Sequence, residues 1–80
     1  MWYVYLLRSQ VQTGCTYVGV SQDLRGRLAE HNSRKSVHTN KYRQWQLVGY
    51  LAFASKARAQ EFERYLKTGS GRAFARRHFW

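Results

Sequence analysis

Residues 15–32, "CTYVGVSQDLRGRLAEHN", decide the fold, because a strand-like run passes directly into a helix-like one. The first part is rich in β-branched and aromatic side chains, which suit a pleated strand. Ser21 can cap the helix that follows, and Asp23 falls in its first turn, where the helix dipole favours an anion. The stretch therefore predicts a strand at 15–20 and a helix that reaches about Asn32.

Alternation along this strand places Tyr17 on one face, between Cys15 and Gly19. A glycine inside a strand costs stability and often marks the close approach of a ligand or another backbone. The alternative is that Tyr17 packs against Tyr3 or Tyr5 across a hairpin, because aromatic pairs are common there. Cys15 is interpreted as a small hydrophobic residue without chemistry.

Helical spacing determines which polar side chains of the next segment face inward. At about 100° per residue, Arg27 and His31 fall within the arc of Leu24 and Leu28. Arg25 points away from that arc and should be solvated. A guanidinium and an imidazole are therefore predicted beside the apolar stripe, close to the strand that carries Tyr17.

The rest of the chain follows from the same local signals and predicts the order β-β-α-β-α-α, a small α/β (α+β) domain with a mostly antiparallel sheet. The remaining predicted elements are, in chain order, a strand over 2–7, a basic loop over 33–44, a covered strand over 45–53, a helix over 56–67 ended by Gly69, and a short helix over 72–79. The segment "GSGR" either contacts a phosphate or only ends one helix and begins another, and the second reading is preferred.

The second predicted helix repeats the pattern of a charge beside an apolar stripe. Ala59, Phe62 and Leu66 form its stripe, Glu63 lies at the edge and Glu61 on the opposite side. A carboxylate at the margin of a core is costly without a positive partner. Surface ion pairs satisfy this requirement in the plainest reading, whereas the functional reading gives Glu63 a metal ion.

The plain reading pairs Glu63 with Lys67 and Glu30 with Arg27, each within one helical turn. In the functional reading, Arg27 binds a phosphate. Spacing alone favours the ion pairs, and the functional reading gains weight only if the strands direct other groups to the same place.

Composition limits the classes of function. Eighty residues predict one domain over 1–80, and 14 Lys and Arg against 4 Asp and Glu give a formal net charge of +10. Such a charge attracts polyanions, so a nucleic-acid partner is expected in preference to a membrane. One cysteine excludes an internal disulfide, and the apolar opening "MWYVYLL" is too short for a signal peptide or a membrane span. We expect a cytoplasmic protein with no obligate protein partner.

These residues together resemble the GIY-YIG nucleases, and in particular the short stand-alone bacterial proteins with that domain. "YVY" at 3–5 and "YVG" at 17–19 match the two signature segments, and "AQEFERYLKTGSGRAFARRHF" matches the helix and glycine turn of the subfamily. The similarity covers essentially the whole chain. The ordered set that carries it is Tyr5, Tyr17, Gly19, Arg27, His31 and Glu63.

The resemblance implies a three-stranded antiparallel sheet flanked by helices, and a metal-dependent phosphodiesterase acting on nucleic acid. By the family's mechanism, Tyr17 is the general base and Glu63 the ligand of one Mg²⁺ or Mn²⁺ ion. Arg27 binds the scissile phosphate, His31 assists proton movement and Tyr5 shapes the site. The presence of only four acidic residues agrees with one metal ion better than with two.

Two departures from the family pattern affect the site. Tyr3 replaces the first glycine of the signature, at a strand position expected to face the surface. No asparagine follows the second helix, so Ser70 or Arg72 is expected to replace it. The other residues predicted to contact nucleic acid are Gly19, Lys35, Lys41 and Arg43.

The function predicted from the sequence is that of an endonuclease that cuts DNA phosphodiester bonds. The candidate substrates are single-stranded, branched or repair-intermediate DNA, with RNA as an alternative. The second reading is a nucleic-acid-binding module on the same fold that cuts slowly or not at all. A basic ribosome-associated or architectural protein without an active site is a third.

Overall fold

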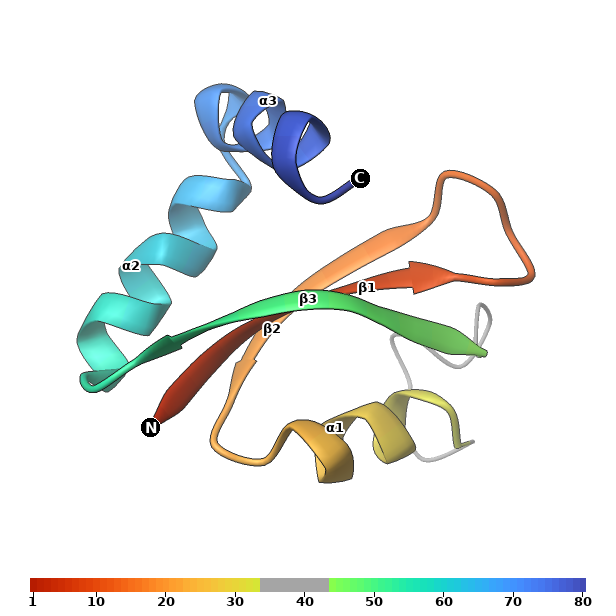
Figure 1. Cartoon of the computed structure of the whole chain (residues 1–80), viewed down its shortest axis with the longest axis horizontal. Coiled ribbons are helices and arrows are strands. Elements are labelled where there is room, and N and C mark those ends of the chain that lie inside the picture. Colours follow the sequence, from red (N-terminus) through yellow and green to blue (C-terminus); the bar gives the residue numbers. More distant parts are fainter. Residues whose placement is uncertain (34–43) are drawn as a thin grey trace.

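A computed structural model describes residues 1–33 and 44–80 of the chain (Figure 1). The predicted order β-β-α-β-α-α is confirmed. The elements are β1 (Trp2–Ser9), β2 (Thr16–Ser21), α1 (Leu24–His31), β3 (Trp45–Phe53), α2 (Lys56–Leu66) and α3 (Gly69–His78). Within the described ranges, no helix has the length and apolar character needed to cross a membrane.

The three strands form one antiparallel sheet in the order β2-β1-β3. β1 is central and buried, and the register places Tyr5 between Gly19 of β2 and Tyr50 of β3. The prediction that residues 45–53 form a covered strand is wrong in part. β3 lies at an edge of the sheet, and the Tyr50 side chain is 52% exposed, because helices cover only part of each face there.

Alternation along the strands divides the interior into two clusters, one on each face of the sheet. Val4 and Leu6 of β1 pack with Ala59 and Leu66 of α2 and with residues of α3. On the other face, side chains from the sheet and from the turn before β2 pack with Leu24 and Leu28 of α1; they are Tyr5, Leu7, Cys15, Tyr17, Trp45 and Leu47. The ribbon accordingly shows α1 on one side of the sheet and α2 with α3 on the other (Figure 1). The predicted division of β2 into a Tyr17 face and a Val18 face is thereby confirmed.

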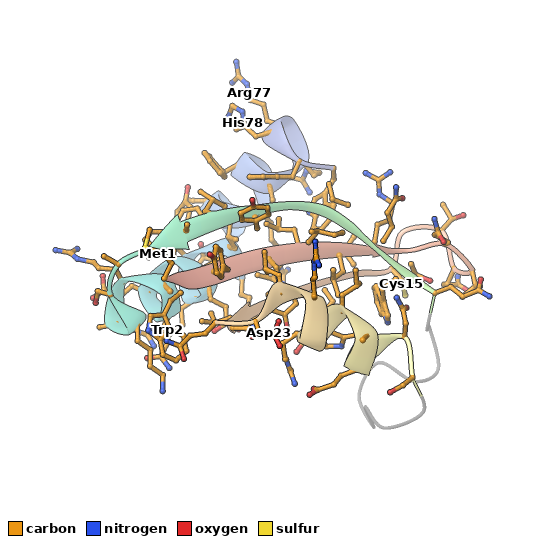
Figure 2. The ribbon with its side chains drawn as sticks, turned by 60° about the horizontal axis from the view of Figure 1, so that its bottom comes forward. Met1, Trp2, Cys15, Asp23, Arg77 and His78 are labelled. Atoms are coloured by element: carbon orange, nitrogen blue, oxygen red, sulfur yellow. The ribbon has the colours of Figure 1, made fainter. Side chains whose placement is uncertain are left out.

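The start of α1 differs from the prediction by two residues. Asp23, and not Ser21, is the N-cap, and its Oδ1 accepts a hydrogen bond of 3.0 Å from the Gly26 N–H. Figure 2 shows Asp23 at this helix start. Ser21 instead accepts a 2.9 Å bond from the Asp23 N–H and so shapes the turn before the cap. A Cβ at Gly26 would lie 2.9 Å from Cγ of Asp23, so a larger residue would crowd the cap.

The boundary between α2 and α3 also differs from the prediction. α2 ends at Leu66 with Lys67 as its C-cap, and Gly69 is the first residue of α3. Thr68 caps α3 by accepting a 3.2 Å bond from the Gly71 N–H at Oγ1. The third helix therefore begins three residues earlier than predicted, because a threonine cap directly follows the preceding helix. "GSGR" forms the first turn of α3, and contact of this segment with a phosphate stays a prediction.

Candidate active site

A buried hydroxyl–imidazole pair forms the floor of the candidate site. The Tyr5 hydroxyl lies 3.0 Å from Nε2 of His31, and the two residues are 2% and 1% exposed. Tyr5 comes from the central strand, and His31 from the last turn of α1. Burial raises the pKa of Tyr5, which the Arg27 guanidinium opposes only in part. Tyr5 is therefore a neutral phenol that positions the imidazole.

Tyr17 lies beside this pair and is only half-buried. Its ring centroid is 4.5 Å from that of His31 and 6.2 Å from that of Tyr5. Its cross-strand neighbour in β1 is Leu7, so Tyr17 is displaced along the hairpin from Tyr5. The predicted packing of Tyr17 against Tyr5 is present, and it occurs in the same cluster as the imidazole.

Gly19 makes room for the phenol of Tyr5. A Cβ at this position would lie 2.5 Å from Cζ of Tyr5 and 3.0 Å from Cε1 of Tyr17. Real side chains do not tolerate such distances, so Tyr5 could not keep its place over an alanine. The close approach that the strand glycine indicated is therefore made by an aromatic side chain across the hairpin.

Arg27 contributes a positive charge at the rim of the cluster. Its Nη1 pairs with Oε2 of Glu30, an exposed carboxylate one turn along α1. The neighbouring Tyr5 phenol, and after it the attraction of Glu30, raises the pKa of Arg27, while partial burial acts in the opposite direction. The guanidinium therefore stays charged, and the ion pair predicted from spacing is present.

The surroundings of His31 favour its neutral form. Removal of the imidazole from water lowers its pKa below the usual 6.5, and the nearby Arg27 charge lowers it further, while Glu30 acts in the opposite direction. A neutral imidazole keeps one ring nitrogen as a hydrogen-bond acceptor. At neutral pH the imidazole is therefore uncharged, and its ring lies in contact with that of Tyr17.

Asn32 is a supporting residue that the sequence analysis missed. Its Nδ2 donates a 3.1 Å bond to the Trp45 carbonyl, and its Oδ1 accepts from the Trp45 N–H. These two bonds join the end of α1 to the first residue of β3 and so hold His31 against the sheet. Trp45 is 5% exposed, and its ring lies 6.3 Å from that of Tyr17. An asparagine at the end of a helix often bonds to nearby backbone and could have been noticed in the sequence. Its partner Trp45 could not be predicted, because it lies 13 residues further along the chain.

Glu63 lies on a different helix from Arg27 and His31. It belongs to α2, which packs on the face of the sheet opposite α1. Its side chain is 24% exposed, and Oε2 lies 3.3 Å from Nζ of Lys67. Tyr5, Tyr17, Arg27 and His31 are therefore brought together, whereas Glu63 comes from the other layer and has the ion-pair partner that spacing indicated.

The remaining acidic residues have structural partners. Asp23 caps α1, Glu30 pairs with Arg27, and Glu61 pairs at 3.7 Å with Arg58. Across residues 1–33 and 44–80, no group of three or more His, Cys, Asp or Glu could hold a metal ion. A metal ion held by a single carboxylate would complete its coordination with water and substrate oxygens, which is acceptable for Mg²⁺.

The residues predicted to contact nucleic acid fall into three groups. Gly19 is buried under Tyr5, whereas Ser70 and Arg72 are exposed in the first turns of α3. Lys35, Lys41 and Arg43 lie outside the described residues. Nucleic-acid contact by any of them stays a prediction. Tyr3, the residue in place of the signature glycine, is half-buried, and its ring packs edge-on against Tyr50 at 5.6 Å.

Comparison with known proteins identifies the family of the chain. The model of the GIY-YIG catalytic domain matches residues 1–77. A UPF0213 protein of Cupriavidus pinatubonensis is 33% identical over 63 residues, which are 78% of this chain and 68% of that protein. No solved structure matches the chain significantly. The chain belongs to the GIY-YIG family of nuclease-type catalytic domains.

Proposed function

We propose that this protein is a metal-dependent endonuclease that hydrolyses DNA phosphodiester bonds, with Tyr17 as the general base. The observation that carries the proposal is the cluster of Tyr5, Tyr17, Arg27 and His31 on one face of the sheet. A phenol, a cation and a neutral imidazole are the groups needed to activate water, bind a phosphate and accept a proton. The preferred substrates are single-stranded or branched DNA.

Burial supports Tyr17 over Tyr5 as the base. Tyr5 is 2% exposed, bonded to His31, and its pKa is raised by burial. Tyr17 is half-buried, so a water molecule and a substrate can reach its side chain. A general base must lie within hydrogen-bond reach of the proton that it removes. Tyr17 therefore receives the proton, while Tyr5 holds the imidazole in place.

A neutral His31 supplies what a tyrosine base needs. A free tyrosine has a pKa near 10, so only about one in a thousand is ionised at pH 7. The imidazole beside Tyr17 can accept the phenol's proton while the phenol takes one from the attacking water. The water oxygen then bonds to phosphorus as the bond to the leaving oxygen breaks. No standing phenolate is required.

Arg27 is positioned to bind the scissile phosphate. Its present partner Glu30 is exposed, and exposed ion pairs contribute only about 0–1 kcal/mol. A phosphate can therefore replace Glu30 at small cost and make a bidentate contact with the guanidinium. The raised pKa of Arg27 keeps the charge constant through the reaction.

Glu63 is the residue that we assign to Mg²⁺ or Mn²⁺. Its bond to Lys67 is on the surface and exchangeable, and Glu63 is the carboxylate that matches the metal-ligand position of the family. A divalent cation held there would polarise the phosphate and stabilise its developing charge. One carboxylate makes a weak site, so binding of the ion should be completed by oxygens of the nucleic acid.

A second candidate is a nucleic-acid-binding module with little or no cleavage. It is favoured by one observation, namely that Glu63 is paired with Lys67 and belongs to a helix on the face of the sheet opposite α1. The net charge of +10 supports binding in either case.

Cleavage of labelled single-stranded and branched DNA, with and without Mg²⁺ or Mn²⁺, tests the proposal. We expect metal-dependent products that disappear in Glu63→Ala and in Tyr17→Phe, while DNA affinity changes by no more than a few fold. Glu61→Ala is the matched control, because Glu61 lies on the same helix and is exposed. Cleavage retained in Tyr17→Phe would remove Tyr17 as the base, and tight binding without products would favour the module.

A further inference from the structure

A basic pocket of about 420 Å³ lies between the outer edge of the sheet and the two C-terminal helices. Residues 16–18 of β2 form one wall, and α2 and α3 form the other. Lys67, Arg72 and Arg76 bring three positive charges to it, and Trp80 brings an indole. The volume is within the range of about 300–1,000 Å³ that is typical of small-ligand sites. The cleavage mechanism proposed above uses none of these four side chains as a catalytic group.

The position of α3 is determined by a close contact between helices. A Cβ at Gly71 would lie 2.5 Å from the carbonyl carbon of Tyr65 and 2.6 Å from Cα of Leu66. The two backbones therefore approach more closely than any side chain permits. The backbone N–H of Trp80 then donates a 2.9 Å bond to the Ala75 carbonyl, which ties the chain after α3 to that helix. These contacts give the pocket a defined wall.

The walls of the pocket select a ligand that is both anionic and apolar. None of the four acidic residues lines it, although Glu63 binds Lys67 from outside. Leu66, Ala75 and Trp80 supply apolar surface beside the cationic groups. A phosphate attached to a flat ring meets both conditions, because bases stack on aromatic side chains while basic residues follow the backbone.

We propose that this pocket binds one unstacked nucleotide of single-stranded DNA, next to the bond that is cut. The proposal rests on the endonuclease function and specifies its substrate. A base within a duplex is stacked and cannot enter such a pocket without being flipped out. β2 is an edge strand whose residue Tyr17 belongs to the catalytic cluster on one face, while the pocket lies against residues 16–18. A single strand can therefore pass over this edge from the phenol to the pocket.

The first test compares two neighbouring arginines of α3. Arg76 and Arg77 are both exposed, but Arg76 lines the pocket, whereas Arg77 points away from the sheet (Figure 2). Affinity for a 12-nucleotide oligothymidylate is measured by fluorescence anisotropy in EDTA at several salt concentrations. For Arg76→Ala we expect about tenfold weaker binding near 100 mM salt and a salt slope reduced by about 0.7. Arg77→Ala should remain within about twofold of the wild type.

Equal losses of oligothymidylate affinity in the two variants would contradict the proposed role of the pocket, because binding would then depend only on the overall charge. A blunt DNA duplex with the same number of phosphates is the second ligand. Arg76→Ala and Arg77→Ala should weaken duplex binding to the same small extent. A loss specific to Arg76→Ala with the duplex would overturn the preference for an unstacked nucleotide.

The second test concerns the base. The wild type should bind oligothymidylate more tightly than an abasic chain of equal length, by about five- to hundredfold, the range of base stacking on aromatic side chains. In Trp80→Leu this ratio should fall by about fivefold or more, and in Trp80→Phe, which keeps an aromatic face, it should persist. An unchanged ratio in a folded Trp80→Leu protein, verified by circular dichroism, would exclude the indole as the stacking surface.

The two proposals can fail separately. The binding measurements contain no metal ion and detect no cleavage, so they report on the pocket even if the protein never cuts DNA. The opposite outcome is metal-dependent cleavage that needs Tyr17 and Glu63, together with identical binding by Arg76→Ala and Arg77→Ala. This outcome would support the endonuclease function and contradict the nucleotide-binding pocket.

Discussion

The Tyr5 hydroxyl and Nε2 of His31, 26 residues apart in the chain, lie 3.0 Å from each other in the protein interior. This bond connects the central strand with the end of α1. The Tyr17 ring lies against His31 at the same place, and Arg27 lies near the Tyr5 phenol. A buried polar pair of this kind specifies one orientation of the ring, because an unsatisfied partner would be costly. The candidate site is therefore part of the core, and its stability and its chemistry can be tested together.

Replacement of Tyr5 by phenylalanine removes one hydroxyl and keeps the ring. A hydrogen bond of this kind contributes about 0.5–1.5 kcal/mol, so Tyr5→Phe should lower the free energy of unfolding by about 1 kcal/mol. Urea denaturation measures the loss. Tyr50→Phe on the exposed side of β3 is the control and should change stability by less than about 0.5 kcal/mol. Cleavage should fall as well, since His31 loses the group that orients it.

Gly19→Ala should destabilise the protein by about 1–3 kcal/mol, because the new methyl group would overlap the phenol of Tyr5. Gly69→Ala is the matched control, as a Cβ at that position meets nothing within 4 Å. Its stability should be unchanged or slightly higher, since alanine is the better helix former. Thermal unfolding separates the two variants. Equal midpoints would show that Gly19 is not a packing requirement.

Gly71→Ala should be more damaging than Gly19→Ala. The added Cβ would meet backbone atoms of Tyr65 and Leu66, which cannot rotate away as a side chain can. We expect a loss of about 3 kcal/mol, equivalent to roughly 12–24 °C in the midpoint of a domain of this size. Differential scanning calorimetry provides the measurement. A midpoint within a few degrees of the wild type would contradict the close contact between α2 and α3.

Asn32→Ala removes both side-chain bonds to the Trp45 backbone. A loss of about 1–3 kcal/mol is expected, two bonds at about 0.5–1.5 kcal/mol each. Gln60→Ala, at an exposed position of α2, should be close to neutral. Because Asn32 follows His31, the variant should also slow cleavage without changing the basic surface. Unfolding and cleavage assays on both variants decide the matter.

The pH dependence of stability follows from His31. Its pKa is lowered in the folded protein, whereas the imidazole of the unfolded chain titrates near 6.5. Between these two values the unfolded state binds more protons, so the free energy of unfolding falls as the pH is lowered below about 6.5. His31→Gln should flatten this part of the curve. Urea unfolding between pH 5 and 8 tests the sign, and a rise in stability on acidification would contradict it.

Local rules were sufficient for much of the site. The two-residue period of a strand predicted that Tyr17 and Gly19 share a face, and helical spacing placed Arg27 and His31 beside the apolar stripe of α1. The same spacing predicted the ion pairs of Glu63 with Lys67 and of Arg27 with Glu30. These relationships depend on a single element and its own period, and they can therefore be read along the chain.

Contacts between elements could not be predicted in this way. Three contacts of this kind are the Tyr5–His31 bond, the Asn32 side-chain bonds to the Trp45 backbone and the close approach of backbones at Gly71. The sequence separation of these partners does not follow the period of a helix or a strand. The starts of two helices were also predicted at the wrong residues. Asp23, and not Ser21, caps α1, and Thr68 caps α3, so that Gly69 begins α3 and does not end α2. A cap is chosen by the path of the chain on both sides of it, which depends on packing.

The element order, the faces of the strands and the charge that attracts a polyanion can all be predicted along the chain. Packing between elements is needed to bring the phenols and the imidazole into one cluster under α1, to place the Glu63 helix on the face of the sheet opposite α1, and to line one pocket with three basic residues and an indole. The physical reason is that periodicity directs a side chain relative to its own element, whereas the burial of two apolar faces determines which elements meet.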